Sequence, residues 1–208
     1  MIKSYIDAER YSVKLGIVFS KLGIPPNVWT VGSLIPAFLG FLSLYNQNLL
    51  LGFIFFSISG LLDAIDGAVA RVTKSVSNLG AFLDGVIDRY VEFLLYIGIF
   101  LYLLPYGSFF MPLQIWIVLL IFGSVMPSYI RAYADHRGVV TEYEELQRMG
   151  GIMERVERVG VILLGMLGGV VFSIKWLQYS VALVTILTNL TAFQRIAFAV
   201  YHAKRKGR

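Results

Sequence analysis

Cysteine is absent from this chain of 208 residues, and histidine occurs only twice. The absence of cysteine excludes disulfides, thiolate chemistry and Cys-ligated metal sites, although it does not indicate a cellular compartment. The two histidines, His136 and His202, show no spacing that is typical of metal ligands. We therefore expect any metal ion bound by this chain to be held by oxygen atoms.

Charged residues are also scarce, at 15% of the chain, whereas 57% of the residues are hydrophobic. The mean hydropathy of +0.72 is far above that of a soluble domain. These values exclude a soluble globular protein and predict a membrane protein. The chain also lacks a positively charged start followed by a short apolar run and a small-residue cleavage site, so we expect no removable signal peptide.

Long apolar runs, in contrast, are abundant. A membrane-spanning helix needs about 20 mostly apolar residues, and six segments of the chain are suitable. They are residues 28–46, 49–70, 79–104, 111–132, 157–174 and 178–200. We therefore predict an all-α integral membrane protein in which residues 23–208 form one domain of six transmembrane helices.

The first 22 residues differ from these spans because they are too polar to cross a membrane. Their apolar side chains fall roughly on one side of a helix, with charged residues on the other: Ile2, Ile6, Val13 and Ile17. This pattern is typical of an amphipathic helix in the membrane interface, and Gly23 and Pro25 would end it before the first span. We predict an interfacial amphipathic helix over residues 1–22.

Lysine and arginine are concentrated in every second connection between the predicted spans. The connections "YNQN" and "LPYGSFF" are uncharged, whereas the second connection carries Arg71 and Lys74 and the fourth carries Arg137 and Arg148. Cytoplasmic connections are enriched in these residues. We therefore expect a multi-pass protein of the cell membrane with both termini on the cytoplasmic side.

Acidic residues cluster within two predicted spans, between residues 60 and 93. They are Asp63, Asp66, Asp84, Asp88 and Glu92. A charge at the centre of a bilayer costs about 3 kcal/mol on insertion scales, and such residues are usually functional. Positions i and i+3 or i+4 share a helix face, so two antiparallel helices could aim all four aspartates at one point near the cytoplasmic surface. Four carboxylates predict a hard-oxygen cation site of the kind that Mg²⁺ and Mn²⁺ prefer.

Two glycines and an arginine accompany these acids. Gly67 and Gly80 each lie four residues from an aspartate of the same helix, so each leaves the backbone accessible on the acidic face. Arg71 adds a guanidinium suited to phosphate, and the combination indicates a diphosphate site. Alternatively, the glycines are helix-packing contacts and the acids pair with Arg71 or Arg89.

Eight positions match the spacing D-x2-D-G-x2-A-R-x8-G-x3-D-x3-D. They are Asp63, Asp66, Gly67, Ala70, Arg71, Gly80, Asp84 and Asp88. This pattern resembles the motif of the CDP-alcohol phosphotransferase family. The segment "PPNVWT", with Asn27 and Thr30, also resembles the family's entry to its first span, and six spans behind an amphipathic helix agree with the family over nearly the whole chain.

The resemblance implies a phospholipid-synthesising enzyme that transfers a phosphatidyl or archaetidyl group from CDP-diacylglycerol or CDP-archaeol to an acceptor hydroxyl, releasing CMP. It implies that the four motif aspartates hold Mg²⁺ or Mn²⁺ and that Asp88 is the general base. The residues implied to border the CDP moiety are Asn27, Thr30, Asp63, Gly67, Arg71, Gly80 and Asp84. The resemblance also implies a homodimer, and we expect no nucleic acid partner. One departure is Lys74, where similar members often have glycine after Thr73.

Three arginines predict a second anion pocket at the cytoplasmic ends of later spans: Arg131, Arg155 and Arg158. A phosphorylated polyol acceptor would need such a pocket. These segments, together with Gln194 and Arg195 of "LTAFQR", resemble the inositol-phosphate branch of the family, the phosphatidylinositol-phosphate and archaetidylinositol-phosphate synthases. Tyr133 and Asp135 depart from that branch, where an arginine and a glutamate are more usual.

Alternative interpretations of these residues concern both the acceptor and the class of protein. A glycerol-phosphate acceptor needs the same charges, which would make the chain a phosphatidylglycerophosphate synthase, and the arginines could also be membrane anchors. Intramembrane acids are typical of cation transporters. Arg71 argues against a transporter because it would repel a bare cation, and a noncatalytic scaffold would not need all four aspartates.

Overall fold

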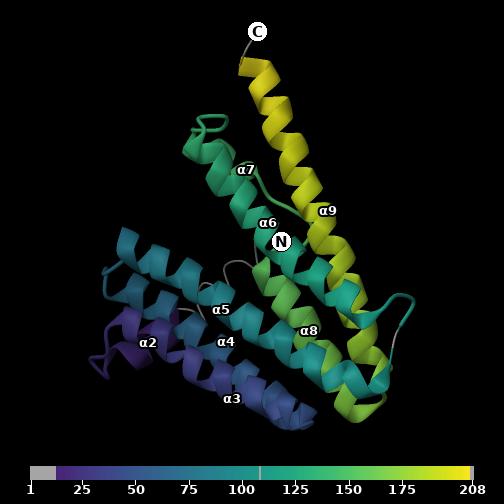
Figure 1. Ribbon diagram of the computed structural model, residues 1–208. Coiled ribbons are helices and arrows are strands. Elements are labelled where there is room, and N and C mark those ends of the chain that lie inside the picture. The colour runs from purple at the N-terminus through teal and green to yellow at the C-terminus, as the bar shows by residue number, and fades with distance from the viewer. Residues whose placement is uncertain (1–12, 108, 207–208) are drawn as a thin grey trace. The chain divides into compact units, whose positions relative to one another are not determined.

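Figure 1 shows the computed structural model of the chain, which describes residues 13–107 and 109–206. These residues form helices and one isolated β-bridge between Phe109 and Met111, with no strand among them. In the described part of the chain, four helical segments are long and apolar enough to cross a membrane: Pro26–Tyr45, Leu49–Val72, Leu113–His136 and Lys175–Arg205. The predicted all-α class is therefore confirmed, with four of the six predicted spans meeting these requirements.

The other two predicted spans fall on α5 (Asn78–Leu103) and α8 (Arg155–Val171). α5 is long enough to span a bilayer, but it carries three acidic residues, and Arg89 directly follows the second of them, Asp88. α8 has only 17 residues, and three of its first four are charged. α5 therefore has too many charged residues for a membrane span by composition alone, and α8 is both too charged and too short.

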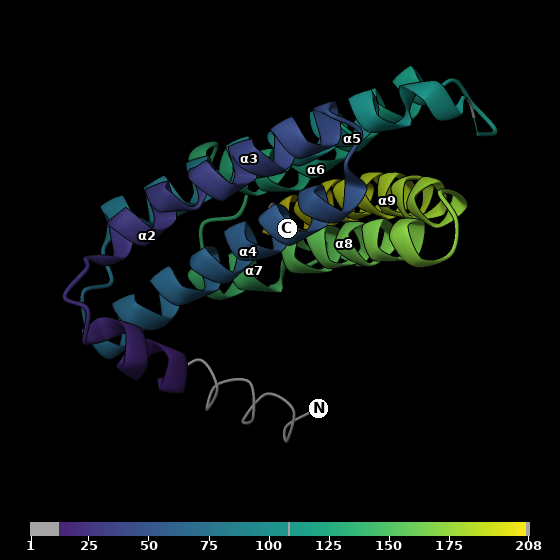
Figure 2. The same cartoon turned by 90° about the horizontal axis from the view of Figure 1, so that it is seen from below.

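The chain divides into two compact units, Met1–Ile99 and Phe100–Arg208. In the first unit, α2 (Pro26–Gly32) and α3 (Leu34–Tyr45) follow one another and both pack on α4 (Leu49–Val72), as Figure 2 shows. Pro25 and Pro26 fix the start of α2, where proline is favoured because the first amides of a helix have no partner. The buried Ser59 hydroxyl of α4 donates to the Ser33 carbonyl at 2.9 Å and ties the three helices together.

Residues 13–20 form a further helical segment of the first unit. Gly16 lies so close to α4 that an added Cβ atom would be 2.5 Å from the Ala68 carbonyl oxygen. Val13 and Ile17, which belong to the predicted apolar side, are exposed. The rest of the predicted amphipathic helix, residues 1–12, lies outside the described residues.

The turn between α4 and α5 is defined by hydrogen bonds at both helix ends. At the end of α4, Ser75 N–H donates to the Ala70 carbonyl at 3.0 Å and Lys74 N–H donates to the Arg71 carbonyl at 3.4 Å. Lys74 has φ of 54°, the left-handed conformation of a Schellman motif, in which glycine is favoured. Ser77 caps α5 by accepting a hydrogen bond from Gly80 N–H at 3.0 Å.

The second unit contains a short 3-10 helix and four α-helices: η1 (Leu104–Tyr106), α6 (Leu113–His136), α7 (Tyr143–Arg148), α8 and α9 (Lys175–Lys206). Both α6 and α8 pack on α9, which is the longest helix in Figure 1. Small residues permit these contacts, since Gly123 faces Asn189 and Gly165 faces Ser180. Many large apolar side chains of both units are exposed, as expected for helices that face lipid.

Candidate active site

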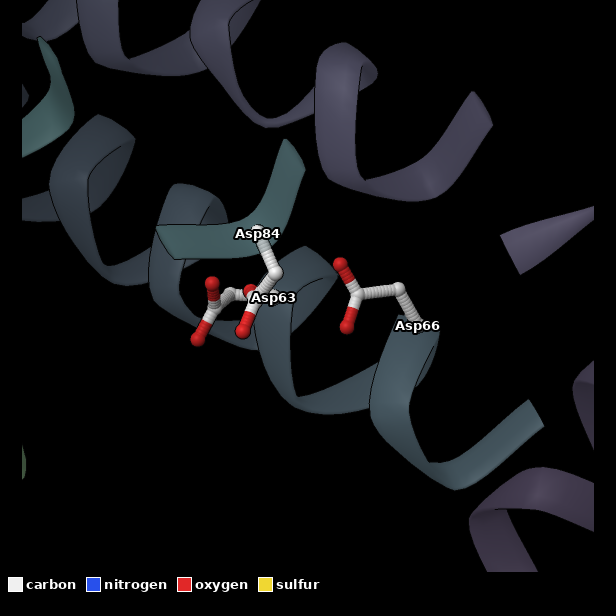
Figure 3. A group of neighbouring side chains, drawn as sticks. All are labelled: Asp63, Asp66 and Asp84. Carbon is white, nitrogen blue, oxygen red and sulfur yellow. The ribbon is translucent and has the colours of Figure 1, made fainter. Parts of the chain in front are cut away.

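Three aspartates of the first unit converge in an aspartate cluster (Figure 3). Asp63 and Asp66 project from one face of α4, and Asp84 projects from α5. Each offers a carboxylate oxygen, and these oxygens lie within 4.8 Å of one another. The spacing of three residues on α4 and the short capped turn to α5 produce this convergence.

Asp88 is not part of this group, although the sequence predicts four carboxylates at one point. It is buried, with 7% of its surface exposed, and it lies one turn beyond Asp84 on α5. Four residues of helix advance about 6 Å along the axis, so the two carboxylates share a face without reaching the same position. Asp88 therefore lies one turn further along α5 than Asp84.

Glu92, one turn further on, is hydrogen-bonded to two side chains of its own helix. Arg89 Nη1 donates to Glu92 Oε2 at 3.0 Å, and the Tyr96 hydroxyl donates to Glu92 Oε1 at 3.2 Å. Glu92 is also buried, and a buried carboxylate needs partners of this kind. The structural pairing considered for the acids thus applies to Glu92.

Asp66 shows that the aspartate cluster suits a cation. The residue is 6% exposed, and its Oδ2 atom is buried without a hydrogen-bond partner. A buried carboxylate oxygen without a partner is costly, and two further carboxylates beside it add repulsion. Carboxylate oxygens are the ligands that divalent cations such as Mg²⁺ and Mn²⁺ accept. The residues present therefore fit a divalent metal ion.

A cleft of about 230 Å³ opens beside the aspartate cluster, between α2, α4, the turn after α4 and the start of α5. Its lining includes Asp66 and six of the seven residues predicted to border CDP. These six are Asn27, Thr30, Gly67, Arg71, Gly80 and Asp84. Asp63, the seventh, lies in the cluster next to the cleft. The structure thus brings together residues that are up to 57 positions apart in the sequence.

The two motif glycines face polar atoms of this cleft. A Cβ atom added to Gly67 would lie 3.2 Å from Arg71 Nη1. One added to Gly80 would lie 3.2 Å from both Asn27 Oδ1 and Ser77 Oγ. Side chains at these positions would displace groups that line the cleft.

Other glycines of the first unit make the helix-packing contacts considered as an alternative. Gly40 lies against the Phe56 ring, and Gly98 lies against the Leu44 side chain. These neighbours are apolar and buried, unlike the polar neighbours of the motif glycines. The packing interpretation therefore describes Gly40 and Gly98 rather than the motif glycines.

The three arginines of the predicted acceptor pocket belong to the second unit. Arg131 lies near the end of α6, and Arg155 and Arg158 lie in the first turn of α8. Arg158 is only 2% exposed, and its Nη1 donates to the Met153 carbonyl at 3.5 Å. A membrane anchor would present its charge to lipid headgroups, so burial argues against that role for Arg158.

A salt bridge that sequence reasoning missed fixes the start of α8. Arg195 of α9 donates from Nη2 to both Glu154 carboxylate oxygens, at 2.7 and 2.9 Å. Arg195 also donates from Nη1 to the Pro127 carbonyl of α6 at 2.7 Å. The resemblance drew attention to Arg195, but no pattern in the sequence pointed to Glu154, because its partner is 41 residues away.

Two further hydrogen bonds hold the same loop against α9. Ile152 N–H donates to Gln194 Oε1 at 3.2 Å, and Met153 N–H donates to Thr191 Oγ1 at 3.0 Å. Residues 152–154 are therefore attached to α9 at three successive positions. This attachment orients the first turn of α8, which carries Arg155 and Arg158.

Comparison with known proteins identifies the family to which this chain belongs. Residues 24–201 match the family of CDP-alcohol phosphatidyltransferases. The archaetidylinositol phosphate synthase of Pyrococcus horikoshii is 35% identical over 195 residues, which cover 93% of this chain and 90% of the relative. The chain belongs to the CDP-alcohol phosphatidyltransferase family, and it is a transferase of phospholipid biosynthesis. The resemblance in the motif is thereby confirmed, and the transporter and scaffold alternatives are set aside.

Solved structures show the same fold. The crystal structure of the Mycobacterium tuberculosis phosphatidylinositol phosphate synthase with CDP-DAG bound has a TM-score of 0.74 and 24% identity, covering 91% of this chain and 94% of that chain. The structure of that synthase in complex with manganese and citrate has a TM-score of 0.75 and 24% identity, covering 91% and 88%. At this identity the likeness establishes the fold.

Proposed function

We propose that this chain transfers the phosphatidyl or archaetidyl group of a CDP-lipid to a hydroxyl of inositol phosphate and releases CMP. The observation that carries the proposal is the cleft lined by the motif residues beside the aspartate cluster. The relatives named as archaetidylinositol phosphate synthase and as phosphatidylinositol phosphate synthase support inositol phosphate as the acceptor.

The metal site of this proposal consists of the four motif aspartates, with Asp63, Asp66 and Asp84 in the cluster and Asp88 one turn further along α5. The unmatched Oδ2 atom of Asp66 supports it, as does the manganese in the structure of the M. tuberculosis relative. When bound, a divalent cation, Mg²⁺ or Mn²⁺, would stabilise charge on the diphosphate and on the departing CMP. The aspartates would hold the diphosphate end of the substrate at the cleft.

Asn27, Thr30, Gly67, Arg71 and Gly80 would bind the CDP moiety in the cleft, with Asp63 and Asp84 at its edge. The guanidinium of Arg71 suits a diphosphate oxygen because it can donate two parallel hydrogen bonds. The cleft volume of about 230 Å³ is below the roughly 300–1,000 Å³ of typical small-molecule pockets. The cleft would therefore take the polar part of the CDP-lipid while its chains remain in the membrane.

Asp88 would act as the general base. Its carboxylate would accept the proton of the acceptor hydroxyl as that oxygen forms a bond to the lipid-bearing phosphorus. The bond between this phosphorus and the oxygen that joins it to CMP breaks, and CMP leaves. Removing a general base lowers rates by roughly 10²–10⁴-fold, so Asp88→Asn should abolish most transfer while CDP-lipid binding persists.

Arg131, Arg155 and Arg158 would bind the phosphate of the acceptor. The burial of Arg158 and the attachment of the preceding loop to α9 support this role, because both restrict the position of the guanidinium groups. We also propose six spans that include α5 and α8, both termini and the active site on the cytoplasmic side, and a homodimer. The alternation of charged and uncharged connections supports this topology.

The proposal is tested by measuring CMP release and lipid product mass from purified protein with Mg²⁺. CDP-diacylglycerol and CDP-archaeol are each combined with inositol phosphate, glycerol phosphate, serine or free inositol, and Asp88→Asn is the control. A product with inositol phosphate alone supports the whole proposal. A product with glycerol phosphate instead would identify a phosphatidylglycerophosphate synthase, and no CMP from any pair would contradict the proposed reaction.

A further inference from the structure

A groove of about 650 Å³ lies between α6 and α9 of the second unit. The two helices are parallel, because contacts from Asn189 to Leu119 and from Arg195 to Pro127 advance together along both. Figure 1 shows them side by side. The groove follows their C-terminal parts, and its apolar lining includes Ile130, Val139, Ile196 and Val200.

Two basic residues lie at one end of this groove. Arg137 directly follows α6, and Lys204 belongs to the last turn of α9. Neither side chain forms a salt bridge with the described residues of the chain, and no acidic side chain lines the groove. The parallel helices therefore bring two uncompensated positive charges to the end of an apolar surface.

Two tyrosines of α6 also line the groove. The rings of Tyr129 and Tyr133 stack at 5.4 Å with an angle of 11° between their planes. The Arg137 guanidinium lies 5.8 Å from the centroid of the Tyr133 ring, within cation–π range. Tyrosines near a positively charged helix end are typical of the level at which lipid headgroups lie. The groove thus combines an apolar lining with stacked tyrosines on the α6 side and two cations toward the C-terminal ends of both helices.

We propose that this groove is a binding site for an anionic phospholipid, with a hydrocarbon chain along the apolar lining and the phosphate beside Arg137 and Lys204. Basic pockets between transmembrane helices bind anionic headgroups. A second copy of this chain is a poorer occupant, because a twofold interface would bring the same two cations against their equivalents. None of the groove residues belongs to the proposed CDP cleft or acceptor pocket, so the site is separate from the reaction.

Native mass spectrometry of the full chain in detergent tests this proposal, with dioleoyl-phosphatidylglycerol and dioleoyl-phosphatidylcholine as probes. A basic residue near an anionic lipid surface contributes about fivefold in affinity, so the pair should yield a roughly 25-fold preference for phosphatidylglycerol. Arg137→Gln with Lys204→Gln should remove this preference. The control, Lys21→Gln with Arg205→Gln, changes net charge equally and should retain it.

A third variant separates the groove from charge alone. Ala203 lines the groove, and Ala203→Phe would fill it while both cations remain. Loss of phosphatidylglycerol binding in this variant supports the proposal. Retained binding would overturn the groove as the site, as would an equal loss in the charge control. Unchanged lipid binding with a shift from dimer to monomer would instead identify a second copy as the occupant.

Discussion

Replacing Lys74 with glycine tests the backbone conformation at the turn that closes the cleft. Lys74 has φ of 54° at the end of α4. The left-handed conformation costs a residue with a Cβ atom about 1–2 kcal/mol, and glycine avoids this cost. Glycine also adds conformational freedom to the unfolded chain, which offsets about 0.4–1 kcal/mol of this gain in stability. We therefore expect Lys74→Gly to increase the free energy of unfolding by about 1 kcal/mol.

Thermal unfolding in detergent measures this effect. For a chain of this length, about 1 kcal/mol corresponds to a rise in Tm of roughly 2–4 °C. The three tryptophans provide the signal, because the absence of cysteine rules out thiol-reactive dyes. Lys74→Ala is the matched control, since it removes the same charge but keeps the Cβ atom and the unfavourable conformation. An equal rise in Tm for Lys74→Ala, or a fall for Lys74→Gly, would refute the backbone argument.

Three further predictions concern the cluster, the salt bridge and the glycines. Asp66→Asn should raise Tm in the presence of a chelator, because it removes a buried charge whose Oδ2 atom has no hydrogen-bond partner. The same variant should show a smaller rise in Tm when Mn²⁺ is added. An unchanged response to Mn²⁺ would contradict the metal site. Glu154→Gln should lower the free energy of unfolding by about 2 kcal/mol, because the charged hydrogen bonds to Arg195 are lost. It should also raise the KM for the acceptor alone. An equal rise in the KM for the CDP-lipid would indicate general distortion. Gly80→Ala should raise the KM for the CDP-lipid with little change in Tm, whereas Gly98→Ala should lower Tm. A fall in Tm for Gly80→Ala with an unchanged KM would instead identify Gly80 as a helix-packing residue.

The aspartate cluster was predictable because its geometry is mostly local. The three-residue spacing between Asp63 and Asp66 defines one face of α4, and the short turn returns Asp84 to the same level. The departure at Lys74 was also informative, since a position where similar chains have glycine adopts the left-handed conformation that glycine favours. These features depend on helix period and turn chemistry, which a sequence displays directly.

Three features of the acidic and basic residues were missed or left open by the sequence. The Glu154–Arg195 salt bridge requires α9 to lie beside the loop before α8, and no periodicity encodes that. Asp88 lies one turn beyond Asp84 on α5, outside the group of three whose carboxylate oxygens lie within 4.8 Å of one another, and its place in the metal site stays a prediction. Glu92 had two interpretations until its Arg89 and Tyr96 partners were located.

The confinement of the cleft and the aspartate cluster to the first compact unit has a consequence for biosynthesis. The residues from Asn27 to Asp88 lie within Met1–Ile99, so their contacts form between helices that are neighbours in the chain. Such contacts close short loops and form quickly, and the N-terminal part of a chain leaves the ribosome first. The unit that contains the cleft and the aspartate cluster can therefore assemble in the membrane while α6 to α9 are still being translated.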